Sequence, residues 1–580
     1  MERTSQSAQL AKASGGSVNI TNDLWHFFYE CLKDDLDRVA IISHHQFPNH
    51  LAWLVSDGLT DHKPPCLSWT YRQLLSAVDQ VVHAFQAHDV PSNTGLLTFI
   101  WNSVECHIFF LAAIKLRIHY VPLDPRLLTN TTELDSVLKA VNPGAVIVIN
   151  EEAARQFDDS SQPTRPNCKA KIILNASTTR PLSSDWSSLS TLTQKARSIP
   201  SKPLPPPPSS PSAITTILFT SGTTNRPKGT PHTIENCITE SEAHDFRHIH
   251  PTSRILLHSP NFRAIFYAWT VCAWRRAACL ILAGPTLHPL TSLEVIRAHR
   301  ATNLTLVPAV WSAIASYPRF EELCPPPAQL EHVGFGGDVV TPALLAKAKA
   351  RLGATRVVSG LGMTECTGFV GWEGGGVEGE VPTFLGFAGV GRPGRGVKVK
   401  ICEADGREVL RRGEIGELHL GGQGVIQGYL EGRFEENFYE DEEGRWFKTG
   451  DRAVMDEDYV LYVLGRFKDI IKRSGYAISP IVVEGHLDSQ PGIKAQVVGM
   501  EHKVLGAVPV AVIQRLSVDA PSDAALMELI VNKLGHESSL EYVVSLQELG
   551  FEEFPKNDQG KILKSELQRR LRLIHENITK

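Results

Sequence analysis

The residues with the clearest chemical use lie in one short segment that follows a β-like run. The run, residues 214–219, leads into Thr220-Ser221-Gly222-Thr223-Thr224-Asn225-Arg226-Pro227-Lys228-Gly229. Glycines let the backbone approach a polyanion closely, and loop N–H groups and hydroxyls donate hydrogen bonds to phosphate oxygens. Lys228 adds a mobile positive charge for the same oxygens. Because no GK[ST] closes the segment, it predicts a phosphate-binding loop other than a Walker loop.

A flexible connector is the alternative interpretation of such a loop, and the motifs further along the chain argue against it. They follow one another in a characteristic order over nearly the whole chain: Leu67-Ser68-Trp69-Thr70-Tyr71-Arg72-Gln73-Leu74, Tyr120-Val121-Pro122-Leu123-Asp124-Pro125, Gly334-Phe335-Gly336-Gly337-Asp338, Gly360-Leu361-Gly362-Met363-Thr364-Glu365, Thr449-Gly450-Asp451, Gly465-Arg466-Phe467-Lys468-Asp469 and Pro555-Lys556-Asn557-Asp558-Gln559-Gly560-Lys561-Ile562-Leu563. The series resembles the acyl-adenylate-forming superfamily, which includes acyl-CoA synthetases, peptide-synthetase adenylation domains and luciferases. The first two motifs are interpreted as structural.

The resemblance implies a site for ATP and Mg²⁺. Thr364 would touch the α-phosphate, and Glu365 would hold magnesium, which commonly takes one carboxylate together with phosphates and waters. Asp451 would accept hydrogen bonds from both ribose hydroxyls, and Arg466 would donate to the ribose or a phosphate. The residues expected to contact the nucleotide are Thr220, Ser221, Gly222, Thr223, Thr224, Lys228, Gly336, Gly337, Asp338, Gly360, Leu361, Gly362, Thr364, Asp451, Arg466 and Lys561.

Two positions depart from the superfamily pattern. Leu361 stands where relatives place an aromatic residue that stacks on adenine, and the loss of a stack costs roughly 1–3 kcal/mol by analogy with base–aromatic contacts. Since leucine can still cover a ring face, weaker ATP binding is expected rather than none. Asn225 replaces the usual glycine of the phosphate loop, and asparagine tolerates a positive φ better than most residues.

The resemblance implies that Lys561 is the catalytic lysine, assisted by Lys228 and Thr364. Attack of a carboxylate on the α-phosphorus places negative charge on phosphate oxygens, and a protonated lysine in a water-poor cleft stabilises that charge. Lys468 falls at the superfamily's hinge position. Gly475 would border a thiol channel that opens when the small domain rotates about the hinge.

The run from His258 to Phe266 gives the clue to the acid substrate, because it stands where the superfamily has its fourth core motif. Amino-acid-activating relatives commonly place an aspartate beside the aromatic residue here, to bind the substrate's ammonium group. This chain has Arg263 after Phe262. Because a cation repels an α-amino group and attracts an anion, we expect a carboxylic acid without an α-amine, of the aryl, fatty or polyketide-like kind.

Composition limits the remaining function classes. A chain of 580 residues is too long for one core, and its 42% hydrophobic and 21% charged residues are ordinary for a globular protein. The net charge of −5 gives no basic footprint for nucleic acid. Ten scattered cysteines without a CxxC pair predict reduced thiols. His44, His45 and His50 are interpreted as a polar loop, because no cysteine or acidic cluster lies nearby in the sequence.

A membrane span and a targeting signal are not expected. The apolar stretch 108–114 is interrupted by Lys115 and Arg117, well short of the roughly 20 residues that a spanning helix needs. The first eighteen residues are small and polar without an apolar core, so residues 1–18 predict a disordered tail rather than a signal peptide. The last three residues are not an SKL-type address. A cytoplasmic location is therefore expected.

The fold is expected to be α/β, with a large N-terminal domain and a small, mobile α+β C-terminal domain. Candidate strands at 145–149, 171–174, 215–219, 254–257, 304–307 and 355–358 alternate with helical segments such as 292–299 and 342–352, which favours layers around mostly parallel sheets. A small β unit is expected from Gly386 onward, with strands at 397–401 and 417–420, and the module after Gly465 predicts strands at 495–498 and 508–513 and a helix at 523–534. The expected divisions are a large domain at 19–464, a proline-rich connector at 199–212, a hinge at 465–469 and a small domain at 470–580.

These expectations predict an AMP-forming acid–thiol ligase. It would join the acid to AMP with release of pyrophosphate and then transfer the acyl group to a thiol. Coenzyme A is the favoured acceptor, because the chain ends nineteen residues after Lys561 without a carrier domain. A separate phosphopantetheinylated carrier protein is the runner-up. A degenerate nucleotide binder and a luciferase-like oxygenase are further alternatives.

Overall fold

The computed structural model describes residues 9–55, 65–162, 164, 166–176, 185–220, 227–243, 248–372, 380–432, 435–556 and 562–578. The predicted site residues Ser221, Gly222, Thr223, Thr224 and Lys561 lie outside the described residues, as does Asn225.

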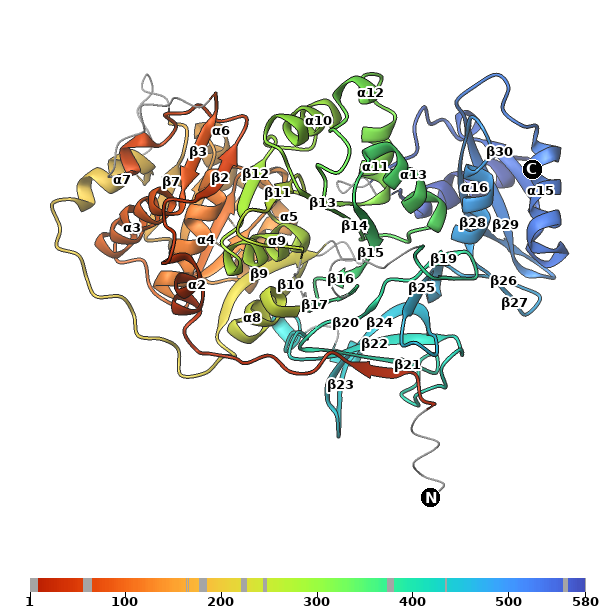
Figure 1. Cartoon of the computed structure of the whole chain (residues 1–580), viewed down its shortest axis with the longest axis horizontal. Helices are drawn as coiled ribbons and strands as arrows, with labels where there is room; N and C mark the ends of the chain where they lie inside the picture. The colour runs from red at the N-terminus through yellow and green to blue at the C-terminus, as the bar shows by residue number, and fades with distance from the viewer. Residues whose placement is uncertain are drawn as a thin grey trace.

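Two seven-stranded sheets form most of the large domain (Figure 1). The first has the order β10 (Lys228–Thr233), β9 (Ile214–Thr220), β5 (His119–Pro122), β4 (Gly95–Phe99), β6 (Pro143–Val148), β7 (Ala170–Ile173) and β8 (Trp186–Ser188). The second has the order β15 (Arg356–Ser359), β14 (His332–Phe335), β13 (Asn303–Leu306), β11 (Arg254–Leu257), β12 (Cys279–Leu282), β2 (Val39–Ser43) and β3 (Leu67–Thr70). Only the outermost strands β10 and β3 pair antiparallel with their neighbours. The expected parallel α/β layers are therefore confirmed.

The two sheets share one hydrophobic core, which is filled by helices packed between them. These helices include α2 (Leu24–Leu32), α3 (Tyr71–Ala87), α4 (Val104–Leu116), α8 (Ile234–Ala243) and α9 (Ala264–Arg275). Twelve of the thirteen residues of α4 are buried, as expected for a helix that is apolar all round. The start of α3 is fixed by a capping box between Thr70 and Gln73.

The opposite face of each sheet is covered by a second set of helices. On the first sheet these are α5 (Thr131–Ala140) and α6 (Glu151–Ser160). Helix α7 (Leu189–Ala196) instead packs against α3 and adds to the core shared by the two sheets. On the second they are α10 (Pro289–Ala298), α11 (Pro308–Ala315), α12 (Phe320–Leu323) and α13 (Pro342–Leu352). The predicted connector, residues 199–212, contains no helix or strand and runs along the outside of the molecule (Figure 1).

A third, antiparallel sheet forms the predicted β unit. Its path is β1 (Lys12–Ser14), β21 (Val397–Cys402), β22 (Gly416–Gly422), β24 (Gly444–Met455) and β23 (Phe438–Asp441), and β25 (Leu461–Arg466) pairs with β24. The prediction of a disordered tail over residues 1–18 is wrong for β1, whose Lys12 lies opposite Lys400. Small ladders are formed by β16 (Leu361–Met363), β17 (Cys366–Gly371) and β20 (Arg392–Pro393), and by β18 (Thr383–Phe384) with β19 (Phe387–Ala388).

The C-terminal part is a separate α+β layer at one end of the molecule (Figure 1). Its sheet contains β26 (Ile471–Arg473), β27 (Tyr476–Ile478), β28 (Ile493–His502), β29 (Gly506–Arg515) and β30 (Tyr542–Ser545). Helices α14 (Pro480–Asp488), α15 (Asp523–Leu534) and α16 (Lys564–Ile578) pack against it. A short 3-10 turn, Phe467–Asp469, connects it to the large domain.

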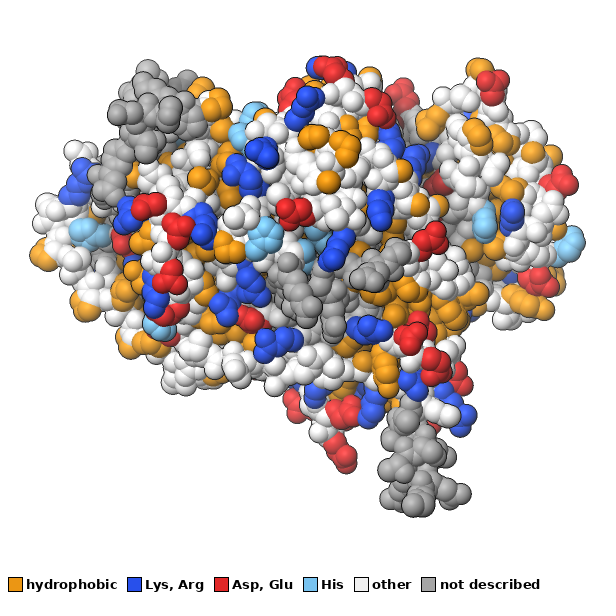
Figure 2. Space-filling model, viewed as in Figure 1, with side chains coloured by type: hydrophobic (Ala, Val, Ile, Leu, Met, Phe, Trp, Pro, Cys, Tyr) orange, Lys and Arg blue, Asp and Glu red, His pale blue; other side chains and the backbone are white. Residues whose placement is uncertain are grey.

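Surface charge is mixed. Figure 2 shows acidic and basic side chains interspersed over the viewed face, without a continuous basic band. Among the described residues, every helix is too short or too polar to cross a lipid bilayer.

Candidate active site

A large cavity of about 770 Å³ lies where strands of both seven-stranded sheets end. In open α/β sheets, ligands bind outside the carboxyl ends of the strands. The cavity wall follows this rule, because each of the following residues ends a strand or follows one closely: Trp101 (β4), Arg126 (β5), Thr220 (β9), His258 (β11), Val307 (β13), Gly336 (β14) and Gly360 (β15).

The predicted glycine turn after β14 forms part of this wall. Gly336, Gly337 and Asp338 all line the cavity. Gly337 has a φ of +77°, and a Cβ at Gly336 would lie 3.1 Å from the carbonyl oxygen of Gly360. Glycine is therefore required here both for the turn and for the close approach of the next predicted motif.

Most of the motif around β16 lines the cavity. Gly360, Gly362, Met363 and Thr364 are among the cavity-lining residues. Leu361 is not among them and packs against the core of the third sheet. The contact between Leu361 and the adenine ring stays a prediction.

The predicted acid-binding residues Phe262 and Arg263 lie in the same cavity wall. The Arg263 guanidinium carbon is 5.2 Å from the centroid of the Phe262 ring, and the Trp101 ring lies beyond Phe262 at 6.4 Å. Tyr267 and Trp269 of α9 add aromatic surface to this wall. The nucleotide motif and the acid motif, about a hundred residues apart, thus face one space.

Cations outnumber acids in the cavity wall. The cationic side chains are Arg126, Arg263, Arg392, Arg395 and Lys556, and the acidic ones are Glu240 and Asp338. Burial lowers the pKa of His232 and His258, which also line the cavity, to about 4, so both imidazoles are neutral at neutral pH. The excess of positive charge suits anionic ligands.

The predicted magnesium ligand Glu365 lies beside the cavity, next to Lys228. The Tyr429 hydroxyl donates to Oε1 of Glu365 at 2.7 Å, and Lys228 Nζ lies 5.2 Å from the centroid of the Tyr429 ring. The net pKa of Lys228 is lowered, because the effect of burial exceeds that of the nearby carboxylates Glu365 and Glu436, which act to raise it. Oε1 accepts a hydrogen bond from tyrosine, and the carboxylate has a second oxygen; one carboxylate is the protein ligand that Mg²⁺ commonly takes, so the chemistry of Glu365 fits Mg²⁺.

Four further predicted residues lie in the β unit, in the connecting turn and in the small domain. Asp451 is buried, and its Oδ1 lies 3.1 Å from Nε of Arg466 across the β24–β25 pair. Lys468 is exposed in the connecting 3-10 turn. Gly475 has a φ of +89° in the β26–β27 hairpin, and nothing lies within 4 Å of a Cβ placed there. None of these residues is among those that line the cavity, whereas Lys556 from the small domain is.

Sequence analysis missed several residues of the wall. Trp101, Arg126, His232 and Glu240 belong to no motif that was assigned to a ligand. Arg126 directly follows the second motif and Trp101 follows an apolar run; strands assigned to these two stretches would have placed both residues after a strand end, where ligands bind. His232 and Glu240 carry no comparable signal.

Comparison with known proteins decides the family. Residues 46–430 match the family model described as AMP-binding enzyme, which covers more than half of the chain. The chain belongs to the AMP-binding enzyme family. The prediction of an acyl-adenylate-forming enzyme, an AMP-forming acid–thiol ligase that uses ATP and Mg²⁺, is confirmed at the level of this class.

Individual members of the family are similar over nearly the full length. An acyl–CoA ligase of Pestalotiopsis microspora is 28% identical over 575 residues, covering 96% of this chain and 97% of that protein. The 4-coumarate–CoA ligase 1 of Arabidopsis thaliana is 24% identical, covering 93% and 95%. The ATP-bound structure of MatB from Rhodopseudomonas palustris superposes with a TM-score of 0.76 at 20% identity, covering 95% and 99%. This last likeness confirms the two-domain fold.

Proposed function

We propose that this enzyme activates a carboxylic acid without an α-amine, of the aryl, fatty or polyketide-like kind, and transfers it to coenzyme A. The observation that carries this proposal is the shared cavity. Thr364 and Gly336 of the nucleotide motifs, Phe262 and Arg263 of the acid motif and Lys556 of the small domain all line it. Adenylation needs the acid and the nucleotide side by side, with a cationic group supplied at the same place.

The first half-reaction joins the two substrates. A carboxylate oxygen attacks the α-phosphorus of ATP, the bond to the β-phosphate oxygen breaks, and pyrophosphate leaves. Thr220, Lys228 and Thr364 are proposed to contact phosphates, with Glu365 holding Mg²⁺ and Asp451 with Arg466 holding the ribose. Lys561, five residues after Lys556 in the same motif, is the proposed catalytic lysine.

The second half-reaction releases AMP. The thiol sulfur attacks the acyl carbon, the bond to the AMP oxygen breaks, and the thiol proton is lost to solvent. Lys468 is the proposed hinge and Gly475 the proposed border of the thiol channel. Coenzyme A is favoured by the similarity to CoA ligases over nearly the full length. A phosphopantetheinylated carrier protein remains the alternative acceptor, and a cytoplasmic location and the domain boundaries at 464 and 470 remain predictions.

The cavity wall supports an acid without an α-amine. Arg263 presents a cation where an ammonium group would otherwise bind, and the adjoining aromatic side chains offer apolar surface for the acyl chain or ring. Glu240, which is buried in the same wall, is the acidic side chain that an ammonium group would need. The proposal follows Arg263, because its guanidinium lies beside the Phe262 ring of the acid motif, and Glu240 is the residue to test against it.

A screen of carboxylic acids by pyrophosphate release tests the proposal. We expect release with aryl, fatty or polyketide-like acids and little with ordinary amino acids. In Arg263→Ala, KM for the preferred acid should rise about tenfold or more, because a charge-assisted contact is lost. Arg319→Ala, which removes an exposed arginine paired with Glu322, is the matched control and should leave KM unchanged.

Three results would contradict the proposal. A preference for an α-amino acid that disappears in Glu240→Gln would assign Glu240 as an ammonium ligand. An unchanged KM in Arg263→Ala would remove Arg263 from the acid site. Failure of every acid to yield AMP or pyrophosphate would indicate a nucleotide-binding protein without ligase activity.

A further inference from the structure

Three potential metal ligands from distant parts of the sequence meet beside the second large sheet. His44 follows β2, Cys66 precedes β3, and His299 is the C-terminal cap of α10. His44 Nδ1 lies 3.0 Å from His299 Nε2, and Cys66 Sγ lies 3.9 Å from the same nitrogen. One ligand atom from each of the three residues lies within 4.8 Å of the other two. The sequence offered His44 no such partners, and the fold supplies them.

The donor types and spacings suit a borderline divalent cation. Zinc binds imidazole nitrogen at about 2.0–2.1 Å and thiolate sulfur at about 2.3 Å, so neighbouring ligand atoms of a tetrahedral shell lie roughly 3.3–3.7 Å apart. The two observed separations differ from that range by a few tenths of an ångström. We propose that His44, Cys66 and His299 bind a borderline divalent cation such as Zn²⁺, with water or another small ligand in the fourth position.

Backbone hydrogen bonds fix the segments that carry the three ligands. The backbone N–H of His44 donates to the Leu282 carbonyl at the end of β12, at 2.9 Å. The N–H of Leu67, next to Cys66, donates to the Gln46 carbonyl at 2.9 Å, which joins the two ligand-bearing segments. Arg254 Nε donates to the His299 carbonyl at 2.6 Å. These hydrogen bonds fix the backbone that carries the three ligands, as a metal site requires. Figure 1 shows β2, β3 and β12 side by side in this region.

The neighbouring histidines have other partners, which singles out His44. His50 Nε2 lies 2.6 Å from Oε1 of Glu105, and His45 Nδ1 lies 3.3 Å from the Ser43 hydroxyl. Among the described residues, the group formed by His44, Cys66 and His299 is the one cluster of three His, Cys, Asp or Glu side chains that converges in this way.

The protonation of the ligands makes the affinity for the cation depend on pH. Burial, together with His44 and Arg254, lowers the pKa of His299 to about 4, so its ring is neutral at neutral pH. Burial raises the pKa of the Cys66 thiol, so each bound ion must displace the thiol proton as the sulfur–metal bond forms. Apparent affinity should therefore increase with pH. The competing interpretation is a hydrogen bond between the two rings beside an unreactive thiol.

Cobalt provides a direct test, because thiolate-bound Co²⁺ has a charge-transfer absorption that oxygen-bound Co²⁺ lacks. The full chain, stripped with a chelator, would be titrated with Co²⁺ in excess Mg²⁺ and without ATP, so that hard oxygen sites are filled. We expect one Co²⁺ per chain, a thiolate band, release of one proton and displacement by Zn²⁺. Cys66→Ser should abolish the band, and His299→Ala should weaken binding roughly tenfold or more.

Two controls keep the test independent of folding. Cys168→Ser, which changes a half-buried cysteine elsewhere, should leave the titration unchanged. Zn²⁺ should raise the thermal midpoint of the intact chain and not that of Cys66→Ser. A thiolate band that persists in Cys66→Ser, or its absence from the intact chain, would overturn the proposal in favour of the ring–ring hydrogen bond.

Discussion

At the scale of single residues, the pair His50 and Glu105 makes stability depend on pH. Burial is the largest single effect on the pKa of His50 and lowers it, but the hydrogen bond to Glu105 and the attraction of its charge together raise the net pKa. Burial likewise raises the pKa of Glu105, but its hydrogen bonds and the charge of His50 together lower the net pKa. The contribution of His50 to the free energy of unfolding is complete below its pKa in the unfolded chain, near 6.5, and is lost as pH rises through its pKa in the folded chain. That of Glu105 is lost as pH falls through its folded value. The pair therefore stabilises most between about pH 4.5 and 6.5.

Thermal unfolding of Glu105→Gln tests this pair. Relative to the intact chain, the free energy of unfolding of the variant should be about 1–2 kcal/mol lower at pH 5.5 and less reduced at pH 8.5. This is the lower part of the range for charged hydrogen bonds, because His50 is partly exposed. Glu30→Gln, in the exposed pair with His26, is the control and should give no such difference. An equal loss at both values of pH would show that His50 is not charged in the folded chain.

Single residues of the site were predictable where their motif resembles that of the superfamily. Gly336, Gly337 and Thr364 were predicted in this way, and their motifs follow the ends of β14 and β15. The orientation of Leu361 was not predicted, since it depends on which face of β16 meets the third sheet. Glu240 was missed because its helix reaches the cavity only through tertiary packing.

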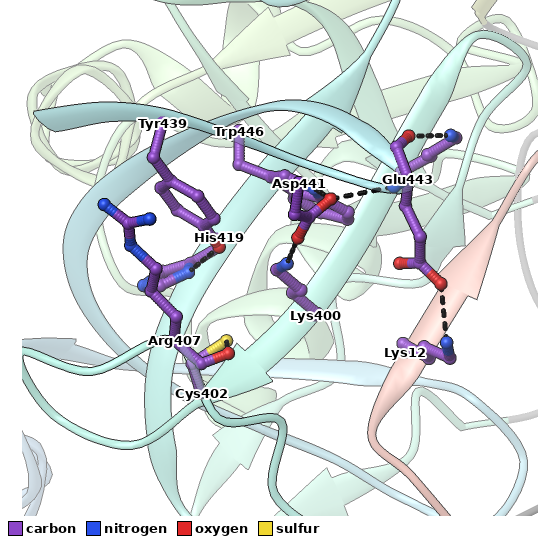
Figure 3. A network of polar contacts seen from close by, with 10 residues as sticks. Lys12, Lys400, Cys402, Arg407, His419, Tyr439, Asp441, Glu443 and Trp446 are labelled. Atoms are coloured by element: carbon purple, nitrogen blue, oxygen red, sulfur yellow. Dashed lines mark hydrogen bonds and ion pairs between the residues drawn. The ribbon is translucent and has the colours of Figure 1, made fainter. Parts of the chain in front are cut away.

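At the scale of elements, the buried ammonium group of Lys400 links strands of the third sheet through an ion pair and a contact with an aromatic ring (Figure 3). Lys400 of β21 is 2% exposed; its Nζ lies 2.6 Å from Oδ2 of Asp441 and 3.9 Å from the centroid of the Trp446 ring. Trp446 Nε1 donates to the other oxygen of Asp441 at 2.8 Å. Removal of the carboxylate charge would leave a buried ammonium group without its counter-ion, which is among the most costly single changes.

Hydrogen exchange of Asp441→Asn tests this network. The free energy of the opening reaction that exposes amides of β21 and β24 to exchange should fall by about 3 kcal/mol. This is the lower end of the range for a broken buried ion pair, because about a third of the Asp441 side chain is exposed. Glu440→Gln, one residue away on the exposed side, should change it by less than about 0.5 kcal/mol. Unchanged protection in Asp441→Asn would show that the aromatic rings alone stabilise Lys400.

Elements were predictable to the extent that their signals are local. The bounds of α13 and α15 agree with the expected 342–352 and 523–534, because Thr341 and Ser522 cap their first turns and Gly353 and Gly535 follow their last residues. Strand β1 was not predicted. Its partner β21 lies far along the sequence, with Lys400 opposite Lys12, and a three-residue polar strand carries no alternation of its own.

At the scale of the whole molecule, the small domain has one residue in the cavity wall and the proposed border of the thiol channel outside it. Lys556 lines the cavity, whereas Gly475 does not. We propose that this is the arrangement of the adenylation step and that the small domain rotates before transfer to the thiol.

Gly475→Ala tests this separation of steps. An alanine at a φ of +89° is strained by about 1–2 kcal/mol and adds a methyl group where the thiol arm would pass. Acyl-adenylate formation should be nearly unchanged, while thioester formation slows roughly tenfold or more. Gly550→Ala, also in the small domain at a positive φ with open space, should affect neither step. Equal effects of the two substitutions would remove Gly475 from the thiol path.

We propose that a lysine of the small domain completes a nucleotide site built by the large one. Exchange of labelled pyrophosphate into ATP, measured with the preferred acid and without thiol, tests this role directly, because it reports adenylation alone. The intact chain should show acid-dependent exchange, and Lys561→Ala should reduce its rate about 100-fold or more. Exchange at an undiminished rate in Lys561→Ala would contradict the role of this lysine.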